Sequence, residues 1–225
     1  MDLASNSASK FNLSLMFLTI ATIGAVVFFA YNPDFDLWLS TKLYHFYYRQ
    51  GSWYGQFLYV LRRLNFWLLY LSLAFILYKT IKLICLKSWQ KLKPYLFILL
   101  SYFMAGVVVS DWLIKPFFKR ARPGQVIQLG KTYTAPFEIG TECQKNCSFI
   151  SGEVAAATAF LSLLVLLPSQ YRRPAALIML FWIILISAVR MAQIGHYLSD
   201  TLFAALLVGI AMLALKIIFN IPHKK

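Results

Sequence analysis

Three polar segments at the ends of apolar runs hold the residues of this chain that are best suited to chemistry. They are residues 115–123, 150–153 and 190–200. Between them they offer fixed cations, a Ser-Gly pair that can open a helix, and a histidine close to a carboxylate. Cations and backbone N–H groups stabilise the negative charge that develops on a transferring phosphoryl group. We therefore expect the three segments to meet in a phosphoryl-transfer site.

The third segment contains the pair from which a nucleophile can be built. His196 and Asp200 are four residues apart, so their side chains share a face if this stretch is helical. The carboxylate would then accept the Nδ1 proton and leave Nε2 as an oriented nucleophile. A single histidine near a membrane interface is usually structural, but this one also has Arg190 six residues before it. The spacing favours a catalytic role.

The first two segments offer groups that bind an anion. Lys115 and Arg122 carry fixed positive charge, as Arg190 does in the third segment. Ser151 and Gly152 precede an apolar run, and a helix that starts there presents free N–H groups and the positive end of its dipole. Taken one at a time, these features are also typical of the basic flank of a membrane helix and of an ordinary helix start. Their combination points to phosphate.

The composition excludes an ordinary soluble globule. Of the 225 residues, 60% are hydrophobic and 13% are charged, against about 45–50% and about 25% in soluble domains. The formal net charge is +14, and the basic residues lie mostly at the ends of apolar runs. This distribution favours membrane topology and contact with anionic head groups over nucleic acid, so no nucleic-acid partner is expected.

Six apolar runs predict an all-α, polytopic membrane protein built as a six-transmembrane-helix bundle. They are residues 11–31, 64–85, 95–114, 149–167, 175–189 and 202–219. Residues 1–10, rich in Ser and Ala, are expected to form a disordered cytoplasmic tail, and residues 11–225 a single membrane domain. When the basic residues of the three polar segments are set aside, the Lys and Arg count places both termini in the cytoplasm. The three segments then face the outer side.

The first outer loop is amphipathic. Apolar residues recur at helical spacing between residues 34 and 49, with tyrosine and tryptophan residues among them and shortly after them. This pattern predicts a helix that lies at the membrane surface, and it leaves open a role in admitting a lipid substrate.

Two of the three cysteines fall in a later outer loop. An oxidising compartment permits a disulfide between Cys143 and Cys147. Three residues separate them, and such a short loop closes only with suitable backbone geometry, so the sequence does not decide whether the disulfide forms. The three cysteines lack the spacing of a zinc site with any histidine, and no metal ligand set is expected.

The order and spacing of the three polar segments resemble the three-part signature of the type-2 phosphatidic acid phosphatase family. The matching residues are Lys115-x6-Arg122-Pro123, Ser151-Gly152 and Arg190-x5-His196-x3-Asp200. The resemblance implies a six-helix membrane phosphatase domain with its active site on the extracytoplasmic side and with no metal or other cofactor.

The resemblance also implies a role for each matching residue. His196 would be the nucleophile that forms a phosphohistidine, and Asp200 would orient it. The phosphate oxygens would be held by Lys115, Arg122 and Arg190, with help from the Ser151 hydroxyl and the Gly152 amide.

Two positions depart from the family pattern. The second motif usually reads Pro-Ser-Gly-His, and its histidine protonates the leaving group; here the motif is Ile150-Ser-Gly-Glu153. The third motif usually begins Ser-Arg and here begins with Val189. Glu153 thus stands where the family has its general acid, and we expect it to take that role.

The choice of substrate is the least constrained part of this interpretation. The segments 32–36 and 143–149, the acidic Glu153 and the stretch 190–196 resemble bacterial lipid A 4′-phosphatases. Undecaprenyl diphosphate, phosphatidylglycerophosphate and phosphatidic acid are alternative substrates, and an inactive lipid-binding or transport protein is the alternative outside enzymes. The expected location is the bacterial inner membrane, with a multi-pass chain and a periplasmic site. The expected partners are a lipid phosphate and the bilayer, without an obligate protein partner.

Overall fold

Helices make up the regular structure of this chain. The computed structural model describes residues 2–49, 52–106, 112 and 114–221, and no strand occurs among them. The α-helices are α1 (Asp2–Tyr31), α2 (Phe35–Arg49), α3 (Ser52–Cys85), α4 (Lys93–Phe103), α5 (Lys115–Phe118), α6 (Pro123–Leu129), α7 (Gly152–Ala159), α8 (Ser169–Ala192) and α9 (Leu198–Ile218). The described residues also form two 3-10 helices, η1 (Trp89–Lys91) and η3 (Phe160–Leu166). The all-α prediction is confirmed for this part of the chain.

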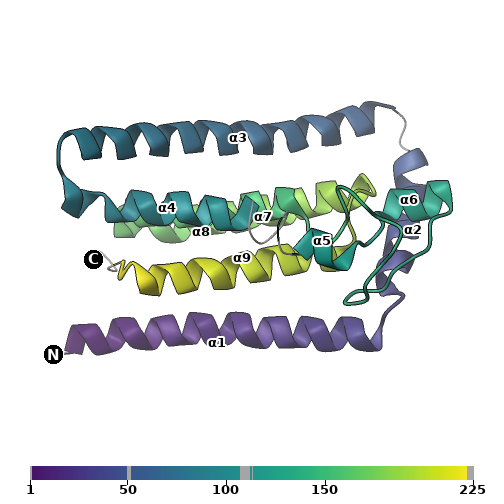
Figure 1. Cartoon of the computed structure of the whole chain (residues 1–225), viewed down its shortest axis with the longest axis horizontal. Helices are drawn as coiled ribbons and strands as arrows, with labels where there is room; N and C mark the ends of the chain where they lie inside the picture. The colour runs from purple at the N-terminus through teal and green to yellow at the C-terminus, as the bar shows by residue number, and fades with distance from the viewer. Residues whose placement is uncertain (1, 50–51, 107–111, 113, 222–225) are drawn as a thin grey trace.

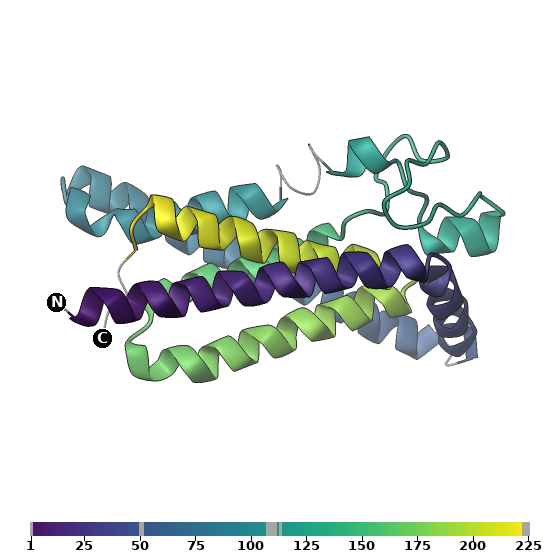
Figure 2. The ribbon, with the colours of Figure 1, turned by 90° about the horizontal axis from the view of Figure 1, so that it is seen from below.

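The long helices form an elongated bundle (Figure 1). Helix α7 lies in its interior and packs against α3, α4, α8 and α9. Helix α1 packs along α9, as Figure 2 also shows. Both termini lie at one end of the bundle, while α2, α5, α6 and the loop after α6 lie at the other end (Figure 1). The topology therefore separates the termini from the three polar segments, as the sequence predicts.

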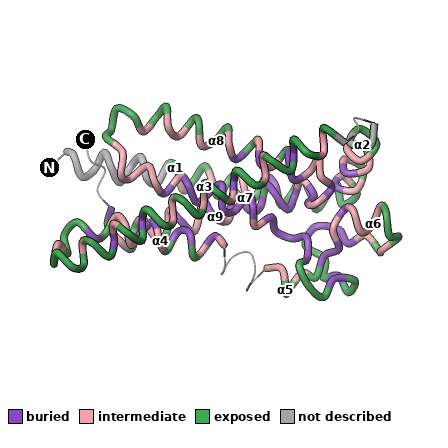
Figure 3. The backbone as a smooth tube through the Cα atoms, turned by 90° about the horizontal axis from the view of Figure 1, so that it is seen from above, coloured by how far each residue is buried: buried purple, intermediate pink, exposed green. Residues whose placement is uncertain are grey.

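Small side chains explain why α7 can occupy the interior. Its sequence is Gly-Glu-Val-Ala-Ala-Ala-Thr-Ala, and every residue after the glycine is buried. Alanine has the highest helix propensity, and small residues let neighbouring helices approach closely. By contrast, the outward faces of α3 and α8 are exposed and rich in large apolar side chains (Figure 3). An apolar exterior of this kind is suited to lipid.

Among the described residues, four helices are long and apolar enough to cross a membrane. They contain Ser14–Tyr31, Trp53–Cys85, Ser169–Ala192 and Leu198–Ile218. They correspond to the first, second, fifth and sixth predicted spans.

The other two predicted spans differ from expectation. In the third, α4 covers only the first part, and residues 107–111 and 113 lie outside the described residues. In the fourth, the apolar helix Gly152–Leu166 is shorter than a full span, because residues 149–151 are non-helical and lead into the helix start. A six-span count is thus not established by helix length.

The structure also tests the predictions for residues 1–10 and for the amphipathic stretch 34–49. Helix α1 begins at Asp2, so the prediction of disorder for residues 1–10 is wrong for residues 2–10, which continue the helix. Helix α2 confirms the helix predicted between residues 34 and 49, and it runs across the end of the bundle (Figure 1). This orientation brings the start of α2 to the polar segments.

Candidate active site

The three polar segments meet at one end of the bundle. The Ser151 N–H donates to the Asp200 carbonyl oxygen at 3.0 Å, which joins the start of α7 to the start of α9. The Gly124 N–H donates to the Ile194 carbonyl oxygen at 2.9 Å, which joins α6 to the turn before α9. These main-chain contacts link segments that lie far apart in the sequence, and they bring the predicted site residues into one neighbourhood.

His196 is buried in the turn that precedes α9. Its Nδ1 lies 2.8 Å from the Ser148 carbonyl oxygen, and because a carbonyl can only accept, Nδ1 carries the proton. In the neutral imidazole Nε2 then carries the lone pair, and Nε2 has no hydrogen-bond partner among the described residues. A buried imidazole with Nδ1 protonated and Nε2 available is the form that a nucleophilic histidine requires.

The partner of His196 differs from the sequence prediction. His196 lies before the N-cap residue Tyr197 and is not helical, so the assumption of a shared helical face is wrong. Asp200 Oδ2 lies 3.6 Å from Nδ1, and the direct hydrogen bond goes to the Ser148 carbonyl oxygen instead. Asp200 therefore acts on the imidazole through its charge, while Ser148 fixes the ring. Sequence spacing alone could not indicate a main-chain acceptor 48 residues away.

Asp200 is fully buried and its carboxylate is saturated with donors. Oδ1 accepts from Arg120 Nη1 at 2.9 Å. Oδ2 accepts from the Tyr197 N–H at 2.8 Å, which caps the start of α9, and from the Ser148 hydroxyl. Burial opposes the charged form of this carboxylate, whereas the Arg120 guanidinium and the two neutral donors favour it.

Arg120 is the buried cation that holds this end of the molecule together. Its side chain is 1% exposed and contacts Asp36 Oδ2 at 3.0 Å and Asp200 Oδ1 at 2.9 Å. Nε donates to the Thr134 carbonyl oxygen at 2.8 Å, and the guanidinium lies 4.0 Å from the centre of the Tyr197 ring. Burial alone would lower the pKa of Arg120, but the carboxylates of Asp200 and Asp36 outweigh it and raise that pKa.

Sequence reasoning gave Arg120 and Asp36 no role. In the sequence, Arg120 is one of several basic residues in the first polar segment. Asp36 is a polar residue of the amphipathic stretch 34–49 and part of the segment 32–36 that resembles lipid A phosphatases. The spacing gives no signal, because residues 120 and 122 of an extended backbone point to the same face. Only the structure distinguishes the two arginines: Arg120 is buried, and Arg122 is half-buried.

Glu153 is the centre of a second charged cluster. Its Oε1 lies 3.0 Å from Arg62 Nη2 and 3.3 Å from Arg190 Nε. Its Oε2 lies 3.5 Å from His196 Nε2. Asn65 supports this arrangement, since its Nδ2 donates to the Glu153 carbonyl oxygen at 3.1 Å and thereby ties α3 to α7. The carboxylate thus separates the available histidine nitrogen from two guanidinium groups.

Arg62 was not identified from the sequence. It lies on α3, 91 residues before Glu153, in a stretch that resembled no motif. The sequence hint is that Arg62 and Arg63 lie directly before the apolar run 64–85, inside the continuous helix α3. Charged residues inside such a helix are costly unless they are paired or line a polar site.

Arg190 is buried in the last turn of α8, where the sequence prediction placed a phosphate ligand. Its Nη1 donates to the Gln193 side-chain oxygen at 2.6 Å. A Cβ at Gly195 would overlap the Arg190 guanidinium, so a larger residue at that position would displace the guanidinium from its present place. The Arg190 guanidinium therefore packs against the turn that carries His196.

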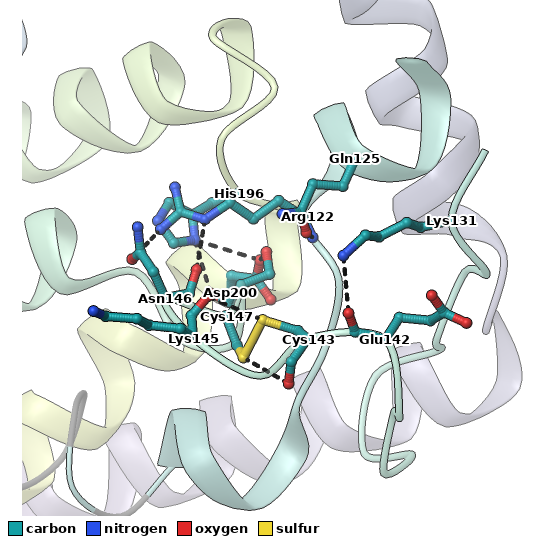
Figure 4. Close-up of a disulfide and its surroundings, with 11 residues drawn as sticks. Arg122, Gln125, Lys131, Glu142, Cys143, Lys145, Asn146, Cys147, His196 and Asp200 are labelled. Carbon is teal, nitrogen blue, oxygen red and sulfur yellow. Dashed lines mark hydrogen bonds and ion pairs between the residues drawn. A yellow bond between two sulfur atoms is a disulfide. The ribbon is translucent and has the colours of Figure 1, made fainter. Parts of the chain in front are cut away.

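Arg122 reaches the same region from the other side. Its Nε and Nη2 donate to the carbonyl and side-chain oxygens of Asn146, at 2.9 and 2.7 Å (Figure 4). Burial lowers the pKa of Arg122, and the charges of Glu153 and Asp200 oppose that effect. Those two carboxylates are thus within electrostatic reach of Arg122.

A disulfide joins Cys143 to Cys147 and holds Asn146 in place (Figure 4). The sequence permitted this bond without deciding it. The two Cα atoms are 5.6 Å apart, within the usual range for a disulfide. Within the closed loop, Asn146 adopts a left-handed backbone conformation with φ of 57°, which asparagine tolerates better than most residues. The loop thereby presents both Asn146 oxygens to Arg122.

The remaining predicted phosphate ligands lie at helix starts. Ser151 is the N-cap of α7, and its hydroxyl accepts from the Val154 N–H at 3.4 Å. Gly152 is the first residue of that helix. Lys115 is half-buried at the start of α5, at the same end of the bundle. Within the described part of the chain, His, Cys, Asp and Glu side chains form no group of three or more that could hold a metal ion.

Comparison with known proteins gives one family and several relatives. The model of a family described as the PAP2 superfamily matches residues 94–224. A lipid A 4′-phosphatase of Francisella tularensis subsp. novicida is 28% identical over 53% of this chain and 55% of its own length. A lipid A 4′-phosphatase of Rhizobium leguminosarum is 34% identical over 56% of this chain and 55% of its own length. A lipid A 4′-phosphatase of Rhizobium etli is 33% identical over 48% of this chain and 44% of its own length.

The matching region spans about half the length of these curated relatives. No solved structure shows significant similarity to the chain. The family match covers all three polar segments, from the approach to Lys115 to the end of α9.

Proposed function

Because this chain belongs to the PAP2 superfamily, we propose that it is a phosphoric monoester hydrolase that removes phosphate from a membrane lipid. The reaction passes through a phosphohistidine on His196. The observation that carries the proposal is the state of this histidine: its Nδ1–H is bonded to the Ser148 carbonyl oxygen, and its Nε2 lone pair faces a cluster of arginines around Glu153. A nucleophilic nitrogen close to two guanidinium groups suits a phosphate dianion, which can take the place of the Glu153 carboxylate between them.

In the first step, the Nε2 lone pair attacks phosphorus. The N–P bond forms while the P–O bond to the lipid breaks, and the lipid oxygen leaves with a proton from Glu153. The imidazole gains positive charge as this happens. The Asp200 carboxylate, 3.6 Å from Nδ1, stabilises that charge.

In the second step, water replaces the histidine. The oxygen of a water molecule attacks phosphorus, the N–P bond breaks, and the Glu153 carboxylate takes the proton of the water. Inorganic phosphate leaves, and His196 regains its lone pair. The oxygen of Glu153 that lies 3.5 Å from Nε2 is close enough to act in both steps.

Substrate binding changes the partners of Glu153. Without substrate, its carboxylate is ionised and paired with Arg62 and Arg190. A phosphate dianion attracts both guanidinium groups more strongly than a single carboxylate does, because it carries more charge. Glu153 then loses its cations, stands beside an anion, and takes up the proton that it later donates. Arg122, Lys115, Ser151 and Gly152 supply further donors to the phosphate oxygens.

Lipid A is the proposed substrate, with the phosphate at its 4′ position as the group removed. The support is the name shared by the three relatives. The proposed location is a bacterial inner membrane crossed six times, with α4 and α7–η3 completing the third and fourth spans. The termini then face the cytoplasm and the site faces the periplasm. No protein partner is part of the proposal.

Phosphate release from a panel of lipids tests the proposal. Purified protein is incubated with lipid A, undecaprenyl diphosphate, phosphatidylglycerophosphate and phosphatidic acid, and free phosphate is measured. We expect release from lipid A above the others, and none from the His196→Ala variant. His45→Ala is the matched control, because His45 is an exposed histidine on α2 at the same end of the bundle. Failure to release phosphate from any lipid would favour a lipid-binding or transport protein instead.

A further inference from the structure

A large apolar cavity lies in the half of the bundle that is remote from His196. Its volume is about 1120 Å³, it is partly open to the outside, and residues of α1, η3, α8 and α9 supply most of its lining. Aliphatic side chains line most of it, among them Leu18, Leu161, Val165, Leu180 and Met212. Pockets for small molecules typically measure about 300–1,000 Å³, so this one is large enough for a lipid chain.

The length of the cavity matches one leaflet of a bilayer. Its lining runs from Arg172 to Ile183 along α8 and from Ala205 to Lys216 along α9. At 1.5 Å per residue, each stretch is about 16 Å long. The hydrocarbon core of a bilayer is about 30 Å thick, so the cavity covers about half of it. An acyl chain that enters from one membrane surface would fill this depth.

Positive charge is concentrated at one end of the cavity. Arg172, Arg173 and Lys216 line that end, and no acidic residue lines the cavity within the described part of the chain. The Arg172 Nε donates to the Leu167 carbonyl oxygen at 2.9 Å, which fixes this guanidinium at the start of α8. The charges of Arg172 and Lys216 are close enough to repel one another. An anion placed between them would relieve this repulsion.

We propose that the cavity binds one anionic diacyl glycerophospholipid, with an acyl chain between α1 and α8 and its phosphate at Arg172, Arg173 and Lys216. This lipid is not the substrate, because Asp200 and Lys216 are about 24 Å apart along α9. It belongs to the leaflet at the end where the termini lie (Figure 1). Since α1 and α8 both line the cavity, the lipid joins them and stabilises the position of α1.

Lipid binding to the intact purified protein tests this inference. Delipidated protein in detergent is titrated with phosphatidylglycerol or phosphatidylcholine of the same acyl chains, and retained lipid is counted by native mass spectrometry. We expect one phosphatidylglycerol bound at least about tenfold more tightly than phosphatidylcholine, since each basic residue near an anionic head group contributes measurably. The triple variant Arg172→Gln, Arg173→Gln, Lys216→Gln should lose this preference and still bind either lipid weakly.

Control variants separate a built site from general attraction of anionic lipid. Lys79→Gln with Lys82→Gln removes two cations of α3 that do not line the cavity, and it should keep the preference. Ala176→Trp fills the cavity and should weaken the binding of both lipids. His196→Ala should bind phosphatidylglycerol as the unaltered protein does. The inference would be overturned if the unaltered protein bound the two lipids equally. It would also be overturned if the α3 variant lost the preference for phosphatidylglycerol as the triple variant does. Loss in His196→Ala would also overturn it, because the lipid would then occupy the active site.

Discussion

Replacing Glu153 by Gln separates the two effects that the proposed mechanism assigns to this residue. Gln has the same shape and keeps an oxygen that can accept from Arg62 and Arg190, so the helix start and the packing of α7 are preserved. The substitution removes the negative charge and the ability to donate an acidic proton. We therefore expect both kcat and KM to fall. Loss of folded protein would lower the apparent kcat and leave KM unchanged.

The magnitudes follow from the position of the carboxylate. Phosphate bound at His196 would lie close to Glu153, because Oε2 is 3.5 Å from Nε2. An ionised Glu153 and one unit charge of a phosphate about 5 Å away would repel by about 3 kcal/mol at an effective dielectric constant of about 20. Proton uptake by Glu153 avoids this repulsion, but binding then carries the cost of protonating a carboxylate that is ionised in the free protein. Gln carries no such cost, so the substitution should lower KM by about tenfold to a hundredfold. Loss of general acid catalysis should lower kcat by about 10²–10⁴-fold.

The assay is steady-state phosphate release from the preferred lipid between about pH 5 and 9. For the unaltered protein, kcat should fall toward high pH, because the substrate-bound Glu153 must be protonated. Glu153→Gln should flatten that alkaline limb. Glu138→Gln, an exposed glutamate of the loop at the same end, should leave both parameters unchanged. A kcat near the unaltered value with the same pH profile would refute the reasoning, and Glu153 would then serve only as a charged residue at the helix start.

Three further expectations concern stability, topology and cofactors. Arg120→Gln should lower the free energy of unfolding by about 3–5 kcal/mol, because it leaves two buried carboxylates without their cation. In the same denaturant titration, the control variant Arg122→Gln, which changes a half-buried arginine two residues away, should unfold near the midpoint of the unaltered protein. Similar midpoints for the two variants would contradict this expectation. Thiol labelling of intact cells should reach Cys143 and Cys147 from outside after reduction, and Cys85 only after permeabilisation; the opposite pattern would reverse the proposed orientation. Activity should survive chelators and be inhibited by vanadate, whereas loss on chelation that a divalent ion restores would contradict a metal-independent reaction.

The sequence predicts the class of fold and the meeting of the three polar segments because both depend on local patterns. Apolar runs of helical length indicate the long helices, and polar residues at their ends must share a membrane face when the helices alternate in direction. The contact between the Ser151 N–H and the Asp200 carbonyl oxygen confirms that the second and third segments meet. The precise ends of the helices were less predictable, since residues 149–151 are apolar or small and yet non-helical.

The residues that sequence analysis missed are those whose partners lie far away in the chain. Arg62 meets Glu153 across 91 residues, and Asp36 meets Arg120 across 84. No periodicity within a helix reports such pairs, because each depends on how the helices pack. The main-chain acceptor of His196 was equally hidden, since the Ser148 carbonyl group carries no sequence signature. Local chemistry could indicate which groups react, but only the packed chain shows which groups hold them.

The buried Asp36–Arg120–Asp200 cluster carries a consequence for the evolution of the chain. Two carboxylates share one guanidinium with little access to solvent, so the loss of Arg120 would leave two buried carboxylates without a cation. A lineage could replace Arg120 by a neutral residue only together with the loss of a carboxylate, for example through a neutral residue at position 36. Among relatives, Asp36 and Arg120 should therefore covary. Asp36, which lies in α2 and outside the match to the family model, should then distinguish relatives that share this architecture from those that share only the three motifs.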